Sequence, residues 1–515
     1  MLEQPMLDAV KQYMASLNQN ITLALGRGEH AKREELQTFL SQIAGTSDRL
    51  TLAEDASLGP ISFAIHNDSG DTGIVFSGIP GGHEFSSLIL AILQAGGSAL
   101  KLDPSIQSLI QGIDQPLHFE TFVSLSCHNC PDVVQALNQF ALLNPLIKNE
   151  MIDGGLFQER IEALGIQGVP TVYLNGEVFA NGKIDTARLV EKLLEKYPQL
   201  AGKAQSSLPV QDVLVIGGGP AGVAAAIYAA RKGVAVTLVA DRIGGQVKDT
   251  MDIENLISVP KTTGPQLAGN LHQHLSAYPV TVKDNLSVKS LTTGDKTHRV
   301  QLSTGEVIES RTVIIASGAK WRELGVPGEK ENIGNGVAYC PHCDGPFFKG
   351  KDIAVIGGGN SGVEAALDLA GIVNHVTVLE FADALKADQV LVDAMAKRDN
   401  IKVLTGVATQ SIRAANGKVE ALVYQERASG TEHTLPLAGV FVQIGLVPNS
   451  EFAGESIAKT RFGEIEINAK CETNVPGIFA CGDVTTVPYK QIVIAMGEGA
   501  KAALSAFDYL LRLQS

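Results

Sequence analysis

The spacing of apolar residues along the chain predicts alternating helices and strands. In the first 100 residues, helical spacing occurs around Leu7–Leu17 and Ala31–Ile43, and a further helical pattern starts near Glu84. Short apolar runs typical of strands lie between them, at Ile61–Ile65 and Gly73–Phe76. Mixed helices and strands of this length favour an α/β fold.

A comparable order of elements recurs from Phe119 onward, which indicates a weak internal repeat. An apolar run at Phe119–Leu125 precedes a helical pattern at Val133–Leu143, and a strand pattern and a final helix (Asp185–Glu195) follow. The alignment places Arg27–His30 opposite Cys127–Cys130. The first copy therefore has no cysteines where the second copy has two. The same alignment places Pro60 opposite Pro170.

The pattern changes after residue 196. Residues 197–209 break all periodicity and are rich in small and polar residues, which is typical of a linker. Val213–Ile216 is then a continuous apolar run, as expected of a strand buried on both faces, and a glycine turn and an alanine-rich helix follow it. The same unit returns at Ile353–Ala370, so we expect two parallel α/β units after the linker.

Length and composition set the class of protein. A chain of 515 residues with 45% hydrophobic and 19% charged residues predicts three or four globular domains with ample core. A net charge of −14 argues against nucleic acid as a partner, because phosphate binding needs a basic face. No apolar run is long enough for a membrane span, and the first residues do not look like a signal peptide. We therefore expect no membrane association and a cytoplasmic location.

Two glycine fingerprints, Gly217-x-Gly219-x-x-Gly222 and Gly357-x-Gly359-x-x-Gly362, each follow an apolar strand and open a helix. The first two glycines allow a tight turn and close approach of a pyrophosphate, and the third lets the helix pack on the strand. An acid that can bind ribose hydroxyls follows about 20 residues later in each unit, Asp241 in the first and Glu380 in the second. A glycine turn of another α/β unit is the alternative, and the repeated context makes it the weaker interpretation.

The second acid also predicts which nicotinamide nucleotide is used. No arginine occurs in residues 376–383, and Glu380 would repel a 2′-phosphate. The charge pattern therefore favours NADH over NADPH.

Near the end of the chain, residues 473–483 read as a short strand ending in Gly482-Asp483. After two dinucleotide units, we interpret this acid as a partner of the ribityl chain of a flavin rather than as a simple turn.

Four of the six cysteines form two Cys-x-x-Cys pairs, which points to redox chemistry or a metal rather than a disulfide scaffold. Cys340–Cys343 lies between the two fingerprints, where a redox disulfide could exchange electrons with a flavin while Asp344 handles protons. The alternative is zinc bound by four cysteines, but the two pairs are far too distant in sequence for a known zinc motif. We therefore favour redox chemistry and expect no metal.

The other pair, Cys127–Cys130, lies between an apolar strand and a helical stretch. The first cysteine is then expected at a helix N-terminus, where the dipole stabilises a thiolate. Cys127 is predicted to be the nucleophile and Cys130 the resolving thiol, with Val169-Pro170 as a cis peptide facing them. Cys471 and Cys481 have no partner at motif spacing, so we expect both to be buried structural thiols.

These motifs together resemble the flavoprotein subunit of bacterial alkyl hydroperoxide reductase, an NADH-dependent peroxiredoxin reductase, nearly from end to end. Residues 211–515 alone resemble low-molecular-weight thioredoxin reductase, and the first 196 residues resemble two fused thioredoxin folds. The sequence departs from the usual pattern of this family at two positions. Asp241 stands where Glu is common, and Cys481 stands where Ala is common. The resemblance rests on these segments: Ser126–Pro131, Ala338–Pro346, Gly357–Gly362 and Val487–Gln491.

The resemblance implies a division into domains and an electron path. The expected ranges are 1–100 (thioredoxin-like, without Cys-x-x-Cys), 101–196 (thioredoxin-like, with it), 197–210 (linker), 211–325 with 450–515 (FAD-binding) and 326–449 (NAD-binding). Electrons would pass from NADH to FAD, then to Cys340–Cys343, with Cys343 facing the flavin, then to Cys127–Cys130 and finally to a peroxiredoxin. The resemblance also implies a homodimer. A thioredoxin reductase or general disulfide reductase with a fused carrier remains the closest alternative, and a zinc-stabilised interaction protein a remote one.

The expected cofactor contacts follow from the fingerprints and the resemblance. For FAD they are Gly217, Gly219, Pro220, Ala221, Gly222, Asp241, Gln246, Asn255, Gly482, Asp483, Gln491 and Ile492. For NADH they are Gly357, Gly359, Asn360, Ser361, Gly362 and Glu380.

Overall fold

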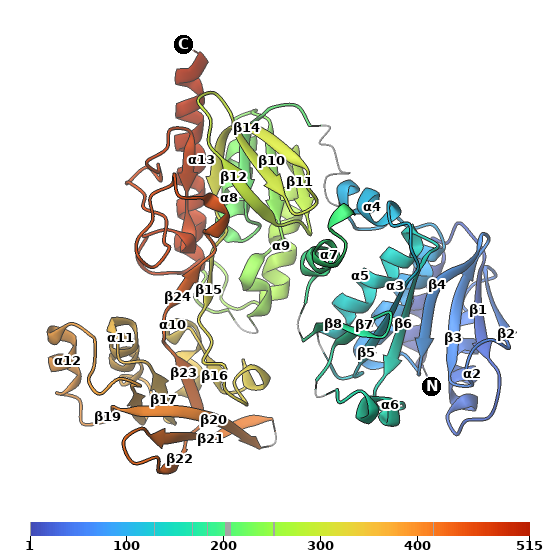
Figure 1. Cartoon of the computed structure of the whole chain (residues 1–515), viewed down its shortest axis with the longest axis horizontal. Helices are drawn as coiled ribbons and strands as arrows, with labels where there is room; N and C mark the ends of the chain where they lie inside the picture. The colour runs from blue at the N-terminus through green and yellow to red at the C-terminus, as the bar shows by residue number, and fades with distance from the viewer. Residues whose placement is uncertain are drawn as a thin grey trace.

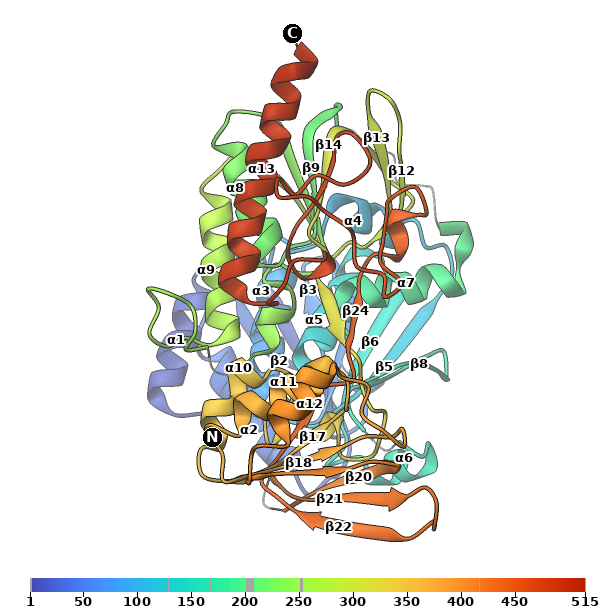
Figure 2. The same ribbon diagram turned by 90° about the vertical axis from the view of Figure 1, so that its left-hand side faces the viewer.

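The structure is a computed structural model that describes residues 2–127, 129–166, 168–182, 184–200, 208–250, 253–415 and 417–514. Within these ranges, the side chains of Asp249, His342, Cys343 and Gln514 are not described. Figure 1 shows three bodies, each built from strands of its own. In the turned view of Figure 2, the long C-terminal helix runs beside the helix that follows the first fingerprint.

The N-terminal domain, residues 2–200, is built on one continuous sheet of eight strands in the order β2-β1-β3-β4-β6-β5-β7-β8. The first four strands and the last four repeat the same order, and β4 and β6 join the halves as a parallel pair. This arrangement agrees with the internal repeat. The strands are β1 (Ile21–Gly26), β2 (Leu50–Asp55), β3 (Ser62–Asn67), β4 (Gly70–Ser77), β5 (Leu117–Val123), β6 (Ile147–Asp153), β7 (Thr171–Leu174) and β8 (Glu177–Asn181).

The helices of this domain begin where the sequence supplies caps. Asp103 accepts a hydrogen bond from the Ser105 N–H at the start of α4, and Asp185 accepts one from Arg188 at the start of α7. The helices are α1 (Gln4–Met14), α2 (Arg33–Ala44), α3 (Phe85–Ala95), α4 (Pro104–Gln111), α5 (Cys130–Leu143), α6 (Gln158–Ala163) and α7 (Thr186–Lys196), with 3-10 turns η1 (Gly82–Glu84) and η2 (Pro198–Leu200).

The second body, here called the discontinuous domain, is formed by two parts of the chain, one before and one after the third body in sequence. Its sheet has the order β11-β10-β9-β14-β13-β12, and β25 pairs with β14. Its elements are β9 (Gln211–Ile216), α8 (Pro220–Ala230), β10 (Val236–Ala240), η3 (Gly245–Asp249), α9 (Gly264–Ser276), β11 (Val280–Asp284), β12 (Val288–Thr292), β13 (His298–Leu302), β14 (Val307–Ile315), η6 (Glu451–Ala453), β25 (Ile478–Ala480), η7 (Gly482–Val484) and α13 (Ile492–Gln514).

The third body, here called the inserted domain, has a parallel sheet in the order β16-β23-β17-β18-β19 and a separate antiparallel sheet β20-β21-β22. The antiparallel pair β15 (Ala319–Trp321) and β24 (Leu446–Pro448) connects it to the discontinuous domain. Its elements are η4 (Lys330–Asn332), β16 (Val337–Ala338), α10 (Pro341–Asp344), η5 (Gly345–Phe348), β17 (Asp352–Ile356), α11 (Asn360–Leu369), β18 (His375–Leu379), α12 (Gln389–Met395), β19 (Ile401–Leu404), β20 (Val407–Ala415), β21 (Lys418–Glu426), β22 (Glu432–Pro436) and β23 (Gly439–Val442).

The N-terminal domain packs directly on the discontinuous domain. Lys283, at the end of β11, is buried between Asp103 (3.3 Å) and Glu306 (2.8 Å), so its ammonium bridges the two domains. The apolar core also continues across this boundary, from Leu200 to Leu286. A buried lysine needs such paired carboxylates, because an unpaired charge in the interior is strongly disfavoured.

Part of the expected linker is therefore packed rather than extended. Leu200 in η2 is 4% exposed and Tyr197 packs on the same core, although residues 197–200 read as linker in the sequence. Residues 201–207 of that linker lie outside the described residues.

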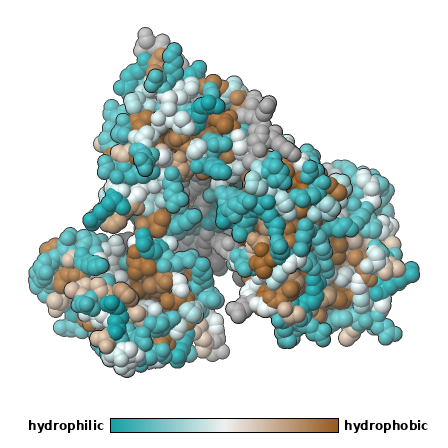
Figure 3. Space-filling view, in the orientation of Figure 1, coloured by the Kyte–Doolittle hydropathy of each residue, from teal (hydrophilic) through white to brown (hydrophobic). Residues whose placement is uncertain are grey.

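Figure 3 shows the same three bodies with mostly hydrophilic surfaces and smaller hydrophobic patches. Over the described ranges, no helix is both long and apolar enough to cross a membrane.

Candidate functional site

The N-terminal dithiol lies where β5 leads into α5. Cys127 is half-buried and Cys130 is buried, and both are free thiols. The Cys127 thiol donates to the Val169 carbonyl oxygen, with Sγ 3.8 Å away, and Val169-Pro170 is cis, as predicted. His128, between the cysteines, lies outside the described residues.

The helix begins between the two positions that the sequence indicates, three residues after Cys127 and three before Val133. Helix α5 starts at Cys130, with Pro131 in its first turn, so Cys127 precedes the helix by three residues. Burial raises the pKa of the Cys130 thiol well above its ordinary value, and a hydrogen bond with Cys127 raises it further. An accessible first thiol and a buried second thiol suit the predicted roles of attacking and resolving cysteine.

Glu84, in η1 of the first half, is a further candidate residue that the sequence did not reveal. Its side chain is 0% exposed, and neither carboxylate oxygen has a hydrogen-bond partner among the described residues. Burial raises the pKa of Glu84 to about 7, the nearby Ser87 hydroxyl opposes the rise, and Asp132 adds to it. The negative charge of Glu84 also contributes to the raised pKa of the Cys130 thiol. The half without cysteines therefore supplies a buried carboxyl group to the dithiol of the other half.

In the first half, residues Arg27–His30 stand opposite the dithiol in the alignment, and helix α2 begins just after them at Arg33. The Arg33 guanidinium donates to the carbonyl oxygens of Gly26 and Pro60, the latter at 3.1 Å. Pro60 was aligned with the cis proline of the second half, but among the described residues only Val169-Pro170 is cis. In the first half, therefore, an arginine side chain binds the Pro60 segment that the alignment places opposite Pro170.

The second pair lies at the start of the inserted domain. Cys340 is disulfide-bonded and precedes α10, and its carbonyl oxygen accepts a hydrogen bond from the Asp344 N–H at 3.0 Å. The side chains of His342 and Cys343 lie outside the described part of the chain. Burial raises the pKa of Asp344 to about 6, which suits a group that handles protons near neutral pH.

Aromatic side chains connect this segment to the discontinuous domain. Tyr339, next to Cys340, stacks on Trp321 with ring centroids 6.2 Å apart, and its hydroxyl donates to Glu329 at 2.9 Å. With the Gln246 amide oriented so that its nitrogen donates to the Ala319 carbonyl oxygen at 2.7 Å, its oxygen accepts a hydrogen bond from Trp321 Nε1 at 3.1 Å. Gln246, an expected flavin contact, is thus separated from the Cys340 segment by two aromatic rings.

The first fingerprint has the geometry that a dinucleotide requires. A Cβ at Gly222 would lie 1.8 Å from the Gly217 carbonyl oxygen, and one at Gly217, where φ is +115°, would lie 2.2 Å from that of Ala316. By contrast, no described atom lies within 4 Å of a Cβ placed on Gly219, directly before α8 begins at Pro220. A tight turn with an open face at a helix N-terminus fits a pyrophosphate.

Other expected flavin contacts are brought together in pairs from distant parts of the sequence. The Asn255 amide donates to the Gln491 side-chain oxygen at 3.1 Å, and a Cβ at Gly482 would lie 3.0 Å from that of Ala221. Burial raises the pKa of Asp483, which lies in η7 just after β25, and Ile492 begins α13. The sequence elements at the two ends of this domain therefore meet at one site.

Asp241 lies at the border with the N-terminal domain. The Asp241 side chain is exposed, and crowding by the surrounding protein together with the carboxylates of Asp185 and Glu191 at α7 raises its pKa to about 6. Glu191 also accepts a hydrogen bond from Ser287 of the discontinuous domain. The expected ribose acid is thus within electrostatic reach of the docked N-terminal domain.

The second fingerprint repeats this geometry. A Cβ at Gly362 would lie 2.0 Å from the Gly357 carbonyl oxygen, and no described atom lies within 4 Å of one at Gly359. The Asn360 amide donates to Asp388 at 2.9 Å, and Ser361 is exposed in the first turn of α11. This turn too fits a pyrophosphate.

The expected ribose acid of the second unit is fixed by the backbone. The Glu380 carboxylate accepts hydrogen bonds from the Gly358 N–H at 2.5 Å and the Ala382 N–H at 2.7 Å. The sequence places no arginine close to Glu380, but the fold brings Arg427 there from the β21–β22 turn. Its Nη1 donates to the Phe381 carbonyl oxygen at 2.9 Å.

The remaining two cysteines are buried and free. Cys471 donates to Glu498 Oε2 at 3.1 Å, and burial raises its pKa to about 12. Burial also raises the pKa of Cys481. Within the described residues, which leave out the side chains of both motif histidines and Cys343, no group of three or more His, Cys, Asp or Glu could hold a metal ion.

Comparisons with known proteins agree with this geometry. Residues 211–499 match the pyridine nucleotide-disulphide oxidoreductase family, and residues 117–195 match the thioredoxin domain family. The F subunit of alkyl hydroperoxide reductase of Escherichia coli (strain K12) is 49% identical over 521 residues, covering 100% of both chains. A Ferdinandcohnia aciditolerans protein named NADH dehydrogenase is 48% identical, covering 99% of this chain and 98% of its own.

A solved structure supports the assignment of the C-terminal part. Thioredoxin reductase from Streptococcus pyogenes is 34% identical with a TM-score of 0.56, and the match covers 59% of this chain and 99% of that one. The α/β fold class expected from the sequence is confirmed. The chain belongs to the family of alkyl hydroperoxide reductase F subunits, and it is a pyridine nucleotide-disulphide oxidoreductase that uses FAD and NAD(P)H.

Proposed function

We propose that the protein carries electrons from NADH through FAD and Cys340–Cys343 to Cys127–Cys130, and from there to the disulfide of a peroxiredoxin. The observation that carries the proposal is a free dithiol in the N-terminal domain, beside a buried carboxyl group, in a chain that also has a disulfide-bonded Cys340 between two dinucleotide turns. A fused dithiol domain gives the enzyme its own carrier to a protein substrate.

The cofactor residues are proposed as the sequence predicts them. Gly217, Gly219, Gly222, Asp241 and Asp483 are central to the FAD site, and Gly357, Gly359, Gly362 and Glu380 to the NADH site. When bound, FAD supplies the two-electron chemistry that takes a hydride from NADH and reduces the Cys340–Cys343 disulfide. The open faces of Gly219 and Gly359 leave room for the two pyrophosphates.

The chain's own thiols perform the exchange steps. The Cys127 thiolate attacks one sulfur of the peroxiredoxin disulfide, and the other sulfur leaves as a thiolate. Cys130 then loses its proton to Glu84 and attacks Cys127 Sγ, which releases the reduced peroxiredoxin and leaves a Cys127–Cys130 disulfide. A thiolate of the Cys340 pair reduces that disulfide by the same two-step exchange. Each exchange moves two electrons and conserves all sulfurs.

Replacing Glu84 by glutamine should remove a pH-dependent step in this exchange. Because the pKa of Glu84 is raised to about 7, the wild-type rate of peroxiredoxin reduction by the prereduced protein should rise as pH increases through that value. Glu84→Gln should lose this rise and be at least about tenfold slower above it. Single-turnover rates across a pH range centred near 7 measure both effects.

Stability distinguishes this loss from misfolding. The folded pKa of about 7 exceeds the ordinary 4.5, so ionised Glu84 destabilises the fold increasingly as pH rises between these values. Glu84→Gln should therefore stabilise the N-terminal domain by up to about 3 kcal/mol above that window. A slower variant that is also less stable in urea at alkaline pH would contradict the role given to Glu84.

The two fingerprints should be separable by adding one methyl group. Gly222→Ala would place Cβ against the Gly217 carbonyl oxygen and should weaken FAD binding about ten- to hundredfold, giving a protein that loses its yellow colour. Gly362→Ala should keep the flavin but lose its reduction by NADH. Gly497→Ala in α13, whose Cβ meets no described atom within 4 Å, is the matched control. Full flavin retention in Gly222→Ala would contradict the assignment.

The preference for NADH rests on the position of Glu380 and agrees with the name of the Ferdinandcohnia aciditolerans relative.

A homodimer is also proposed, supported by exposed apolar side chains on α13, including Val493, Leu504 and Leu511. A cytoplasmic location is also proposed, because four of the six cysteines lie in two Cys-x-x-Cys pairs and do not form the disulfide scaffold typical of secreted proteins.

Acceptor choice tests the proposed function. NADH oxidation should be fast with an oxidised peroxiredoxin and a hydroperoxide, and slow with oxidised thioredoxin. Faster turnover with thioredoxin would instead make the protein a general disulfide reductase with a fused carrier. A purified protein without flavin colour would exclude both enzymes.

A further inference from the structure

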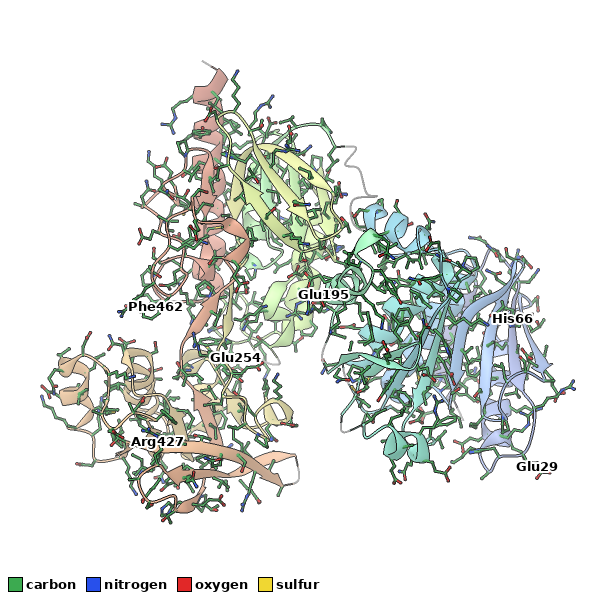
Figure 4. All side chains as sticks on the ribbon, viewed as in Figure 1. Glu29, His66, Glu195, Glu254, Arg427 and Phe462 are labelled. Atoms are coloured by element: carbon green, nitrogen blue, oxygen red, sulfur yellow. The ribbon has the colours of Figure 1, made fainter. Side chains whose placement is uncertain are left out.

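The loop after β18 is shaped by two long-range backbone contacts. The Gly406 N–H donates to the Ala382 carbonyl oxygen at 2.8 Å, and the Arg427 N–H donates to the Gly406 carbonyl oxygen at 2.9 Å. These bonds tie the β21–β22 turn to the loop that carries Glu380. Arg427, far away in the sequence, is thereby fixed beside the expected adenosine ribose site, in the inserted domain as Figure 4 shows.

The Arg427 guanidinium is already engaged by three groups of this loop. It lies 4.2 Å from the centroid of the Phe381 ring, donates to the Phe381 carbonyl oxygen at 2.9 Å, and donates to Asp383 Oδ1 at 3.3 Å. The Asp383 side chain is 93% exposed and that of Arg427 is 40% exposed, so solvent reaches both charges.

An arginine at this place has a chemical consequence. A guanidinium is the group that suits a 2′-phosphate best, because it offers several N–H donors and a fixed positive charge. Left unpaired, Arg427 would attract the 2′-phosphate that distinguishes NADPH from NADH. Asp383 offers it a carboxylate instead, and adds a negative charge that repels phosphate.

We propose that Asp383 and Arg427 form a specificity-determining pair, in which Asp383 neutralises Arg427 and so suppresses binding of nucleotides that carry a 2′-phosphate. The inference rests on the proposed nicotinamide site and adds two residues to the selectivity given to Glu380. It predicts that the chain holds a latent phosphate-binding arginine, which removal of one carboxylate would release.

Binding of two adenosine nucleotides to the holoenzyme tests the pair without relying on activity. The probes are AMP and adenosine 2′,5′-bisphosphate, which differ only in the 2′-phosphate, and the measurement is the Kd by titration calorimetry. The variants are Asp383→Asn, Arg427→Gln and the double variant. Asp393→Asn is the matched control, because it removes an exposed acid of the same domain whose carboxylate accepts from Gln389 instead.

Asp383→Asn should bind the bisphosphate about three- to tenfold more tightly while its affinity for AMP stays within about twofold. The double variant and Asp393→Asn should show no such gain. A gain that persists in the double variant would overturn the proposal and point to Lys386, which lies on the same loop through its N–H bond to Gly358. Equal gains for both nucleotides, or no gain in Asp383→Asn, would also overturn it.

The proposed function is checked separately in the same samples. Reduction of the flavin by NADH in the wild-type protein keeps that function intact even if the Asp383 variant shows no gain. Failure of the wild-type protein to bind AMP or to be reduced by NADH would overturn the nicotinamide site and the pair together.

Discussion

Replacing Cys127 by serine should abolish the reduction of peroxiredoxin while leaving reduction of the flavin by NADH unchanged. The reason is structural, since Cys127 is the half-buried thiol of its pair and Cys130 is buried with a raised pKa. A serine hydroxyl is not ionised at neutral pH and cannot attack a disulfide. We expect a loss of at least about a thousandfold in turnover with peroxiredoxin as acceptor.

The partner variant gives a different signature. Cys130→Ser should also stop turnover, but it should accumulate a covalent adduct in which Cys127 is joined to the peroxiredoxin. Denaturing electrophoresis without reductant detects that adduct. Normal turnover in Cys127→Ser would show that the N-terminal dithiol is not an obligatory carrier, and an adduct in Cys127→Ser alone would reverse the two roles.

The second large effect concerns the inserted dithiol. Cys340→Ser and Cys343→Ser should each block electron transfer to Cys127–Cys130, since one sulfur cannot form the disulfide that carries two electrons. The resemblance implies that Cys343 faces the flavin. Cys340→Ser should therefore show a long-wavelength charge-transfer band from the remaining thiolate, and Cys343→Ser should show little or none. A strong band in Cys343→Ser only would reverse the assignment.

Local sequence rules predicted the dinucleotide turns because their geometry depends on few residues. Gly222 must be glycine because any Cβ would meet the Gly217 carbonyl oxygen, and such a constraint is visible in sequence. The repeat, the cis peptide at Pro170 and the burial of Cys471 and Cys481 also agree with the expectations. Each of these follows from short-range pattern or composition.

The residues that sequence reasoning missed depend on contacts between distant segments. Glu84 reads as a polar residue before an apolar helix, and only the folding of η1 against α5 places it beside Cys130. Arg427 lies outside residues 376–383, where the sequence shows no arginine. The β21–β22 turn places its guanidinium next to Phe381 in the folded chain. Leu200 read as linker because its neighbours are small and polar, although its own side chain is buried.

The order in which the two dithiols are reduced tests the electron path most directly. The oxidised protein would be mixed with one equivalent of NADH without oxygen, quenched at short times with an alkylating reagent, and the label on each cysteine measured by mass spectrometry. The path predicts label at Cys340 and Cys343 first and at Cys127 and Cys130 later, with none at the latter pair in Cys340→Ser. Label at Cys127 before Cys340, or in the Cys340→Ser protein at the wild-type rate, would contradict it.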